Sequence, residues 1–284
     1  MAGAMVRPGW KSPSAWLRAA VVALAVVGAL RLLAPALRPA TRGMADDACP
    51  SAEASLLDKA LLSLRVLGGD RPYFDHWTAL CFYAEENAAI LREGRKVETA
   101  FIGDSITRNW LISDPAAFAG PQVNRGISGQ SAAQVLARFQ SDVVALKPRT
   151  VHLMIGTNDV AGLHGPSRPQ DWQAAIRAMV DLAQANGIAV ILATLPPMAV
   201  NPVDPDHRPA EVIRQQNAWL AQFAAEKGLV LADYHAALAD AQGGFRPGLS
   251  LDDIHPSEQG YAAMKPVLEG ALAAVSARPA AEGR

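Results

Sequence analysis

Short apolar runs alternate with longer helical stretches from Val97 onward, and this alternation limits the fold more than any other feature of the chain. The strand candidates are Thr99–Ile102, Val123–Arg125, Val151–Ile155, Ala189–Ala193 and Leu229–Ala232. The helical stretches are Ser131–Leu146, Gln170–Asn186, Ala210–Lys227 and Ser257–Ala274. Gly187 and Gly228 follow two of these helices, where a C-cap is expected. The pattern predicts an α/β fold with a parallel sheet of five strands, covered by helices on both faces.

The segments that follow the predicted strands carry most of the residues with chemical potential. In a parallel sheet, sites form beyond the carboxyl ends of the strands, so we expect these segments to lie close together. They are Gly103-Asp104-Ser105, Gly126-Ile127-Ser128-Gly129-Gln130-Ser131, Gly156-Thr157-Asn158-Asp159, Thr194-Leu195-Pro196-Pro197 and, before the last helix, Asp252-Asp253-Ile254-His255-Pro256. All but the proline-rich one contain residue types that are used in acyl transfer.

Ester hydrolysis through a serine needs a base, an acid that orients the base, and donors for the oxyanion. Ser105 is a candidate nucleophile because it follows a strand at the start of a helix. His255 is the candidate base, and Asp252, three residues earlier, can orient its ring. The candidate oxyanion donors are the N–H groups of Ser105 and Gly129 and the side-chain amide of Asn158.

Each of these residues alone also has a purely structural explanation. Gly-Asp-Ser is a common helix cap, and Gly129 can serve a turn. Asn158 can form an Asx turn, His255 can be an ordinary loop residue, and Asp252 can cap the last helix. What favours catalysis is that all of them fall, in order, at one predicted edge of the sheet.

Taken together, the four blocks around Ser105, Gly129, Asn158 and His255 resemble the SGNH (GDSL-type) hydrolase superfamily. The resemblance covers about Val97 to Ala274. It implies a flavodoxin-like three-layer α/β/α fold and serine ester hydrolysis with no metal or other cofactor. Block by block, it assigns the roles to Ser105 (nucleophile and oxyanion donor), Gly129 and Asn158 (oxyanion donors), Asp252 (acid) and His255 (base).

Two residues depart from the usual pattern of these blocks. Asp253 stands where relatives often have a small residue, which leaves the acid role open between Asp252 and Asp253. Arg108 follows the serine block, either as a solvated surface residue or as a partner for an anionic group. Among the other histidines, His152 is expected in the core, and His164 is a candidate for the substrate rim.

The expected function is that of an esterase or acylhydrolase acting on short acyl or O-acetyl esters of carbohydrates or lipids through an acyl-enzyme on Ser105. The alternatives are an acyltransferase that passes the acyl group to a glycan hydroxyl, and an inactive binding module of the same fold. The expected partner is a small-molecule or glycan ester. Nucleic acid is not expected, because a net charge of −1 provides no basic surface for it.

The N-terminal region differs in composition from the rest of the chain. Basic residues precede an uncharged apolar run, Ala19–Leu30, as in a signal peptide or membrane anchor with a tether, assigned here to residues 1–45. This predicts export to the periplasm or the exterior, with membrane association if Leu17–Leu37 inserts.

The remaining boundaries follow from the helical and strand patterns. Residues 46–96 are predicted to be a helical extension, with one helix within 56–67 and another from about Trp77 to Leu91; the hydrolase domain spans 97–276 and a tail 277–284. In an oxidising compartment Cys49 and Cys81 either pair or remain separate thiols.

Overall fold

The computed structural model describes residues 78–201, 204 and 206–278. These residues contain a five-stranded sheet in the order β2-β1-β3-β4-β5, in which every neighbouring pair is parallel. The strands are β1 (Thr99–Gly103), β2 (Gln122–Gly126), β3 (Thr150–Met154), β4 (Ala189–Ala193) and β5 (Val230–Ala232). The predicted parallel sheet is confirmed.

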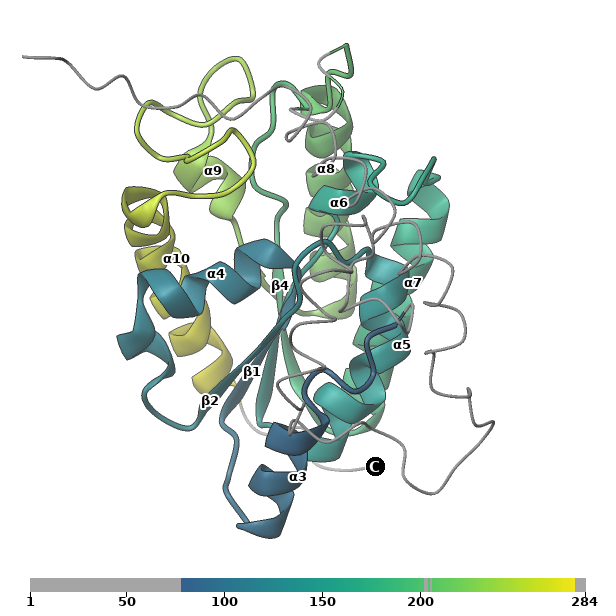
Figure 1. Cartoon of the computed structure of the whole chain (residues 1–284), viewed down its shortest axis with the longest axis vertical. Coiled ribbons are helices and arrows are strands. Elements are labelled where there is room, and N and C mark those ends of the chain that lie inside the picture. Colours follow the sequence, from purple (N-terminus) through teal and green to yellow (C-terminus); the bar gives the residue numbers. More distant parts are fainter. Residues whose placement is uncertain (1–77, 202–203, 205, 279–284) are drawn as a thin grey trace, which may run out of the picture. The chain divides into compact units, whose positions relative to one another are not determined.

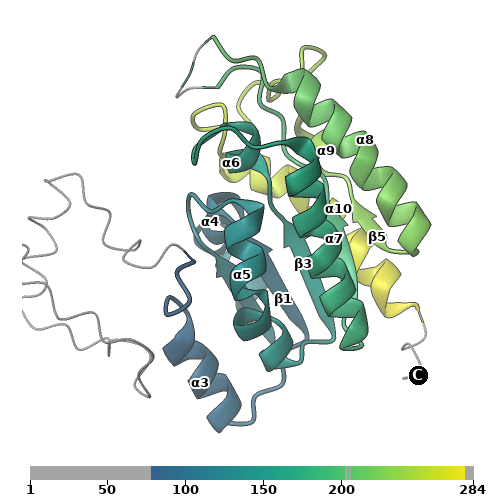
Figure 2. The same ribbon diagram turned by 90° about the vertical axis from the view of Figure 1, so that its right-hand side faces the viewer.

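Helices lie on both faces of the sheet, which gives the three layers expected from the resemblance (Figure 1). They are α3 (Ala84–Arg92), α4 (Ser105–Ser113), α5 (Ala132–Asp142), α6 (Thr157–Val160), α7 (Pro169–Ala185), α8 (Ala210–Lys227), α9 (Tyr234–Leu238) and α10 (Glu258–Ser276), with the 3₁₀ turns η2 (Pro115–Phe118) and η3 (Val144–Leu146). Helices α5, α7 and α8 pack on one face, and α4, α9 and α10 on the other (Figure 2). The prediction of one continuous helix through Leu146 was wrong, since the α-helix ends at Asp142 and a separate 3₁₀ turn follows.

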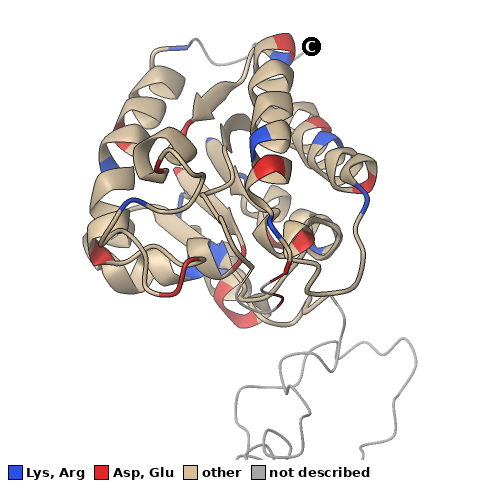
Figure 3. Cartoon of the chain, turned by 90° about the horizontal axis from the view of Figure 1, so that it is seen from above, with Lys and Arg blue, Asp and Glu red and all other residues tan. Residues whose placement is uncertain are grey.

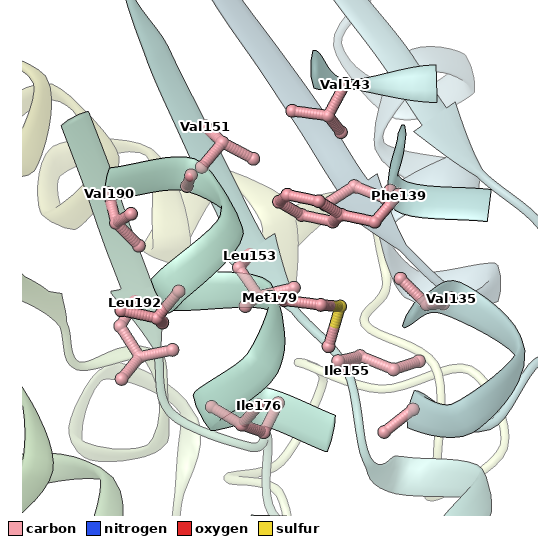
Figure 4. Close-up of a cluster of buried hydrophobic side chains, with 14 of the residues drawn as sticks. Val135, Phe139, Val143, Val151, Leu153, Ile155, Ile176, Met179, Val190 and Leu192 are labelled. Carbon is pink, nitrogen blue, oxygen red and sulfur yellow. The ribbon is translucent and has the colours of Figure 1, made fainter. Parts of the chain in front are cut away.

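Alternating side chains of the strands fill the two cores. Ala100 and Ile102 of β1 enter the core under α5 and α7, whereas Phe101 between them enters the core under α4 and α10. Figure 4 shows the first core, where side chains of β3 and β4 meet those of α5 and α7: Val151, Leu153, Val190, Leu192, Phe139 and Met179. Burial on both faces fixes the strands, and with them the positions of the loops that follow.

The segment before α3 does not follow the sequence prediction. A helix was expected from about Trp77, but α3 begins at Ala84, and the preceding described residues form turns in which Ala79 has a φ of 51°. The reason is a tertiary contact: the Tyr83 hydroxyl donates a 2.5 Å hydrogen bond to the Gly126 carbonyl. Contacts with the sheet therefore override the local helical pattern.

Several N-terminal predictions fall on residues that the structure does not describe. The apolar run, the helix within 56–67 and Cys49 lie outside the described residues, so the pairing of Cys49 with Cys81 stays a prediction. Among the described residues, none of the helices combines the length and apolarity that a membrane span requires.

Candidate active site

The ends of β1, β2 and β3 meet at one edge of the sheet. Gly103 lies beside Gly126 on one neighbouring strand and Met154 on the other. Gly126 must be a glycine, because a Cβ there would lie 2.3 Å from the backbone nitrogen of Arg108. The segments that follow these strands are therefore neighbours, as the sequence predicts.

Ser105 is the first residue of α4 and lies directly above the end of β1. Asp104 caps the helix, because its Oδ1 accepts a 2.9 Å hydrogen bond from the Ile106 N–H. The buried side chains of Ile106 and Trp110 hold α4 against the sheet. A helix start leaves its first N–H groups without intrahelical partners, so the Ser105 N–H can serve a ligand.

Three predicted residues form a continuous hydrogen-bonded chain. The Ser105 Oγ lies 2.8 Å from His255 Nε2, and His255 Nδ1 lies 2.8 Å from Asp252 Oδ2. Because a carboxylate only accepts hydrogen bonds, the ring proton belongs on Nδ1. Nε2 is then free to accept the hydroxyl proton of Ser105, which is the tautomer that a general base needs.

The loop that carries His255 is organised by Asp252. Its Oδ1 accepts from the N–H groups of Ile254 and His255, at 3.1 and 2.7 Å, while Oδ2 meets the ring. Desolvation acts against ionisation, but the hydrogen bonds from His255 and Ile254 hold the pKa of Asp252 below its ordinary value. Asp253 occupies a left-handed turn with a φ of 65°, and its side chain bonds to none of the described residues. The aspartate in contact with the His255 ring is thus Asp252 and not Asp253.

The two other predicted oxyanion donors lie on adjoining segments. Gly129 has a φ of 79°, and its carbonyl accepts a 2.7 Å hydrogen bond from His164 Nε2. Asn158, at the start of α6, donates from Nδ2 to the Gln130 carbonyl at 2.9 Å. Within the described part of the chain, neither the Ser105 N–H nor the Gly129 N–H is bonded to another group. His164, the candidate for the rim, thus holds the Gly129 turn.

Two further aspartates of these segments, Asp104 and Asp159, accept hydrogen bonds from backbone N–H groups. Asp104 is 2% exposed, and burial raises its pKa to about 7. Burial likewise raises the pKa of Asp159 to about 6, and its Oδ2 accepts from the Ala132 N–H at 2.9 Å. His152 is a core residue, as expected: it is fully buried, bonded to the Tyr234 hydroxyl at 2.9 Å, and burial lowers its pKa to about 3.

Charged side chains also lie outside the candidate site, within the part of the chain that the structure describes. No cluster of three or more His, Cys, Asp or Glu residues suited to a metal occurs in the described ranges. Seen from above, the acidic and basic residues of the described part are interspersed (Figure 3). Arg108 lies with its guanidinium 5.3 Å from the centre of the Phe82 ring.

The sequence reasoning missed two fully buried polar residues beneath the site, Gln130 and Arg138. A signal for Arg138 was present: it shares a helical face of α5 with buried Val135, Phe139 and Asp142. A charged pair four residues apart on an apolar face indicates a buried ion pair.

The chain is similar to known proteins in both sequence and fold. The sequence pattern of the GDSL-like lipase/acylhydrolase family matches residues 101–263. An acetylxylan esterase from Geobacillus stearothermophilus is 31% identical over 147 residues, which are 49% of this chain and 66% of the esterase. An uncharacterized lipoprotein, YqeF, from Bacillus subtilis (strain 168) is 34% identical over 125 residues, which are 37% of this chain and 51% of the lipoprotein.

These two matches span less than two thirds of either relative's length. A crystal structure of a GDSL-like lipase from Bacteroides thetaiotaomicron is more completely covered. It aligns with a TM-score of 0.65 at 30% identity, over 70% of this chain and 99% of that one.

Proposed function

The chain belongs to the GDSL-like lipase/acylhydrolase family, and on that premise we propose that it hydrolyses carboxylic esters through an acyl-enzyme on Ser105. His255 is the general base, Asp252 orients it, and the Ser105 N–H, the Gly129 N–H and the Asn158 amide bind the oxyanion. The observation that carries the proposal is the chain of 2.8 Å contacts from Ser105 through His255 to Asp252.

Acylation follows from this geometry. The Ser105 Oγ attacks the ester carbonyl carbon as its proton passes to His255 Nε2. The carbonyl π electrons move onto the oxygen, which the three donors stabilise. When the tetrahedral intermediate collapses, the C–O bond to the alcohol breaks and His255 returns the proton to the leaving oxygen.

Deacylation uses the same groups in reverse order. His255 takes a proton from water as the water oxygen attacks the acyl carbon. The bond to Ser105 Oγ then breaks, the acid leaves, and Oγ regains its proton. Asp252 stays ionised throughout, consistent with the hydrogen bonds that lower its pKa, and stabilises the imidazolium in both halves.

The substrate class is the finer part of the proposal. A relative named acetylxylan esterase supports short acyl groups, in particular O-acetyl groups of carbohydrates. We expect kcat/KM to fall from p-nitrophenyl acetate to longer acyl chains, and acetylated xylo-oligosaccharides to release acetate. A rate that rises with chain length would point to lipid esters instead.

The direct test is Ser105→Ala. Removing the nucleophile should reduce p-nitrophenyl acetate turnover by roughly 10⁴-fold or more, leaving the melting temperature unchanged. The matched control is Ser113→Ala, at the other end of α4, which should retain the wild-type rate. Unchanged turnover in Ser105→Ala, or a fluorophosphonate that labels another residue, would refute the mechanism. Adding a xylo-oligosaccharide acceptor distinguishes hydrolysis from acyl transfer by the product formed.

The N-terminal pattern and a relative named as a lipoprotein together support export of this chain. Fusing residues 1–45 to alkaline phosphatase tests this, because that enzyme is active only after export. A fusion in which Arg7, Lys11 and Arg18 are replaced by glutamate is the control, and should lose the activity. Equal phosphatase activity in both fusions would argue against the predicted signal.

A further inference from the structure

Beneath the candidate site lies a buried arginine that touches two of its segments at once. We propose that Arg138 is a positioning residue, which acts through Gln130 to set the place of the oxyanion donors relative to Ser105. The inference rests on the proposed function. It concerns two residues that contact neither the reacting atoms nor solvent.

The three hydrogen bonds of Arg138 lead to different parts of the fold. Its Nη2 donates at 3.0 Å to the carbonyl of Gly103, two residues before Ser105. Its Nε donates at 2.6 Å to the side-chain oxygen of Gln130, which follows Gly129. The planar guanidinium has fixed donor directions, so it sets the spacing between the end of β1 and the Gly129 turn.

Gln130 extends this support to the third donor. Its backbone carbonyl accepts the 2.9 Å hydrogen bond from Asn158 Nδ2, and its side-chain nitrogen donates to the Thr78 carbonyl at 3.2 Å. The path from Arg138 to Asn158 therefore passes through one residue. A shift of Gln130 would move the Gly129 N–H and the Asn158 amide together.

The charge of Arg138 is compensated by Asp142, one turn further along α5. Nη1 donates to Asp142 Oδ2 at 2.9 Å, and Asp142 Oδ1 accepts from Asn87 Nδ2 at 2.7 Å. Both side chains of the ion pair are at most 1% exposed. A buried pair of this kind gives no clear gain in stability over apolar residues of the same volume. Apolar residues could not form the hydrogen bonds that fix the end of β1 relative to the Gly129 turn, and this is what the ion pair adds.

The test is Arg138→Lys, which keeps the charge near Asp142 but loses the fork that reaches both Gly103 and Gln130. We expect kcat on p-nitrophenyl acetate to fall roughly 10- to 100-fold, with KM changed less than about threefold, since small misplacements of donors act on the transition state. Arg125→Lys is the matched control. Arg125 is 2% exposed and bonds to Glu86, Asn87 and the Asn124 carbonyl. It is linked to Arg138 through Asn87 and Asp142 but bonds to neither Gly103 nor Gln130, so Arg125→Lys should lower the melting temperature without lowering kcat.

A double-mutant cycle separates positioning from general destabilisation. If Arg138 acts through the donors, Arg138→Lys should reduce kcat by a smaller factor in the Asn158→Ala background than in the wild type, because only its effect on the Gly129 N–H remains. Equal losses in both backgrounds, or a loss in Arg125→Lys as large as in Arg138→Lys, would overturn the proposal. If Arg138→Lys does not fold, Gln130→Met replaces it in the cycle, because it removes the same hydrogen bond with the volume kept.

The outcomes also separate this inference from the proposed function. Loss of turnover in Ser105→Ala together with additive effects in the cycle leaves the esterase mechanism standing and refutes the role of Arg138. Full turnover in Ser105→Ala refutes both. Non-additive effects in a protein that depends on Ser105 support both.

Discussion

The candidate site has two groups of residues with different surroundings. The donor group (Ser105, Gly129 and Asn158) packs on buried polar side chains, whereas the base group (Asp252 and His255) lies in an exposed loop. Beneath the first group, Asp104 is 2% exposed and Gln130 is fully buried. In the second group, the side chain of Asp252 is 52% exposed and that of His255 26% exposed. The first group is held by hydrogen bonds between segments far apart in the chain, such as those of Arg138. The loop is held mainly by bonds between its own neighbours.

Under the proposed mechanism, this difference follows from the role of each group. Oxyanion donors stabilise charge only when they are fixed before it develops, so their support has to be rigid and shielded from water. A general base needs a hydrogen-bond partner that orients it and a position close to the hydroxyl that it deprotonates. A short loop can provide both. We therefore expect activity to survive small conformational changes in the base group but not a change in its titratable groups. In the donor group, we expect substitution of the buried polar residues beneath it to reduce activity.

The largest expected effect is a change of chemistry in the exposed loop. In Asp252→Asn the backbone hydrogen bonds can persist, but the amide would donate to Nδ1 and force the proton of His255 onto Nε2. We expect kcat to fall by roughly 10⁴-fold with little change in melting temperature. Asp253→Asn is the control and should retain the wild-type rate. If the two variants lost activity equally, the acid role would not belong to Asp252 alone.

A smaller effect is expected from Asp104, the buried aspartate beneath the donor group, on the pH dependence of the free energy of unfolding. Folded protein keeps the proton of Asp104 up to about pH 7, whereas the unfolded chain releases it near 3.8. Between these values the folded state binds more protons, so the stability contributed by the protonated carboxyl is present below about pH 4 and lost as the pH rises through 7.

Asp104→Asn keeps the cap on Ile106 and removes this dependence. Its free energy of unfolding, relative to wild type, should rise with pH by about 1.4 kcal/mol per unit across that window, measured by urea denaturation. Only the difference between the two proteins is informative, because His152, with a pKa lowered to about 3, acts in the opposite direction. The lowered pKa of Asp252 also has the opposite sign. A constant difference would mean that Asp104 is ionised when folded.

The sequence predicted the parts of this design that depend on local pattern. Apolar runs alternating with helical stretches predicted the strands, and the rule that sites form at strand ends predicted that Ser105, Gly129 and Asn158 lie at one edge. The spacing of Asp252 and His255 predicted the contact between their side chains, which are three residues apart. The match of the GDSL-like lipase/acylhydrolase pattern to residues 101–263 confirms the resemblance that these blocks suggested.

The features that the sequence did not predict depend on contacts between residues that are far apart in the chain. Gln130 and Arg138 belong to residue types that are mostly exposed, and nothing local marks the carbonyl of Gly103 as the acceptor. The turns before α3 were missed for the same reason, since the contact of Tyr83 with Gly126 overrides the helical pattern. The short helix α9 was missed because five residues give little periodicity.

The smallest expected effect comes from loosening the loop without changing its chemistry. Ser250 Oγ donates to the His255 carbonyl at 2.9 Å and accepts from the Asp253 N–H at 2.9 Å. Ser250→Ala removes these two bonds and a third, 3.3 Å bond from the Asp252 N–H, which should cost about 1 kcal/mol of stability by thermal denaturation. Because Asp252 still orients the ring, kcat should fall less than about tenfold. A loss comparable to that of Asp252→Asn would show that the base group is as rigidly constrained as the donor group, and the contrast between the two groups would fail.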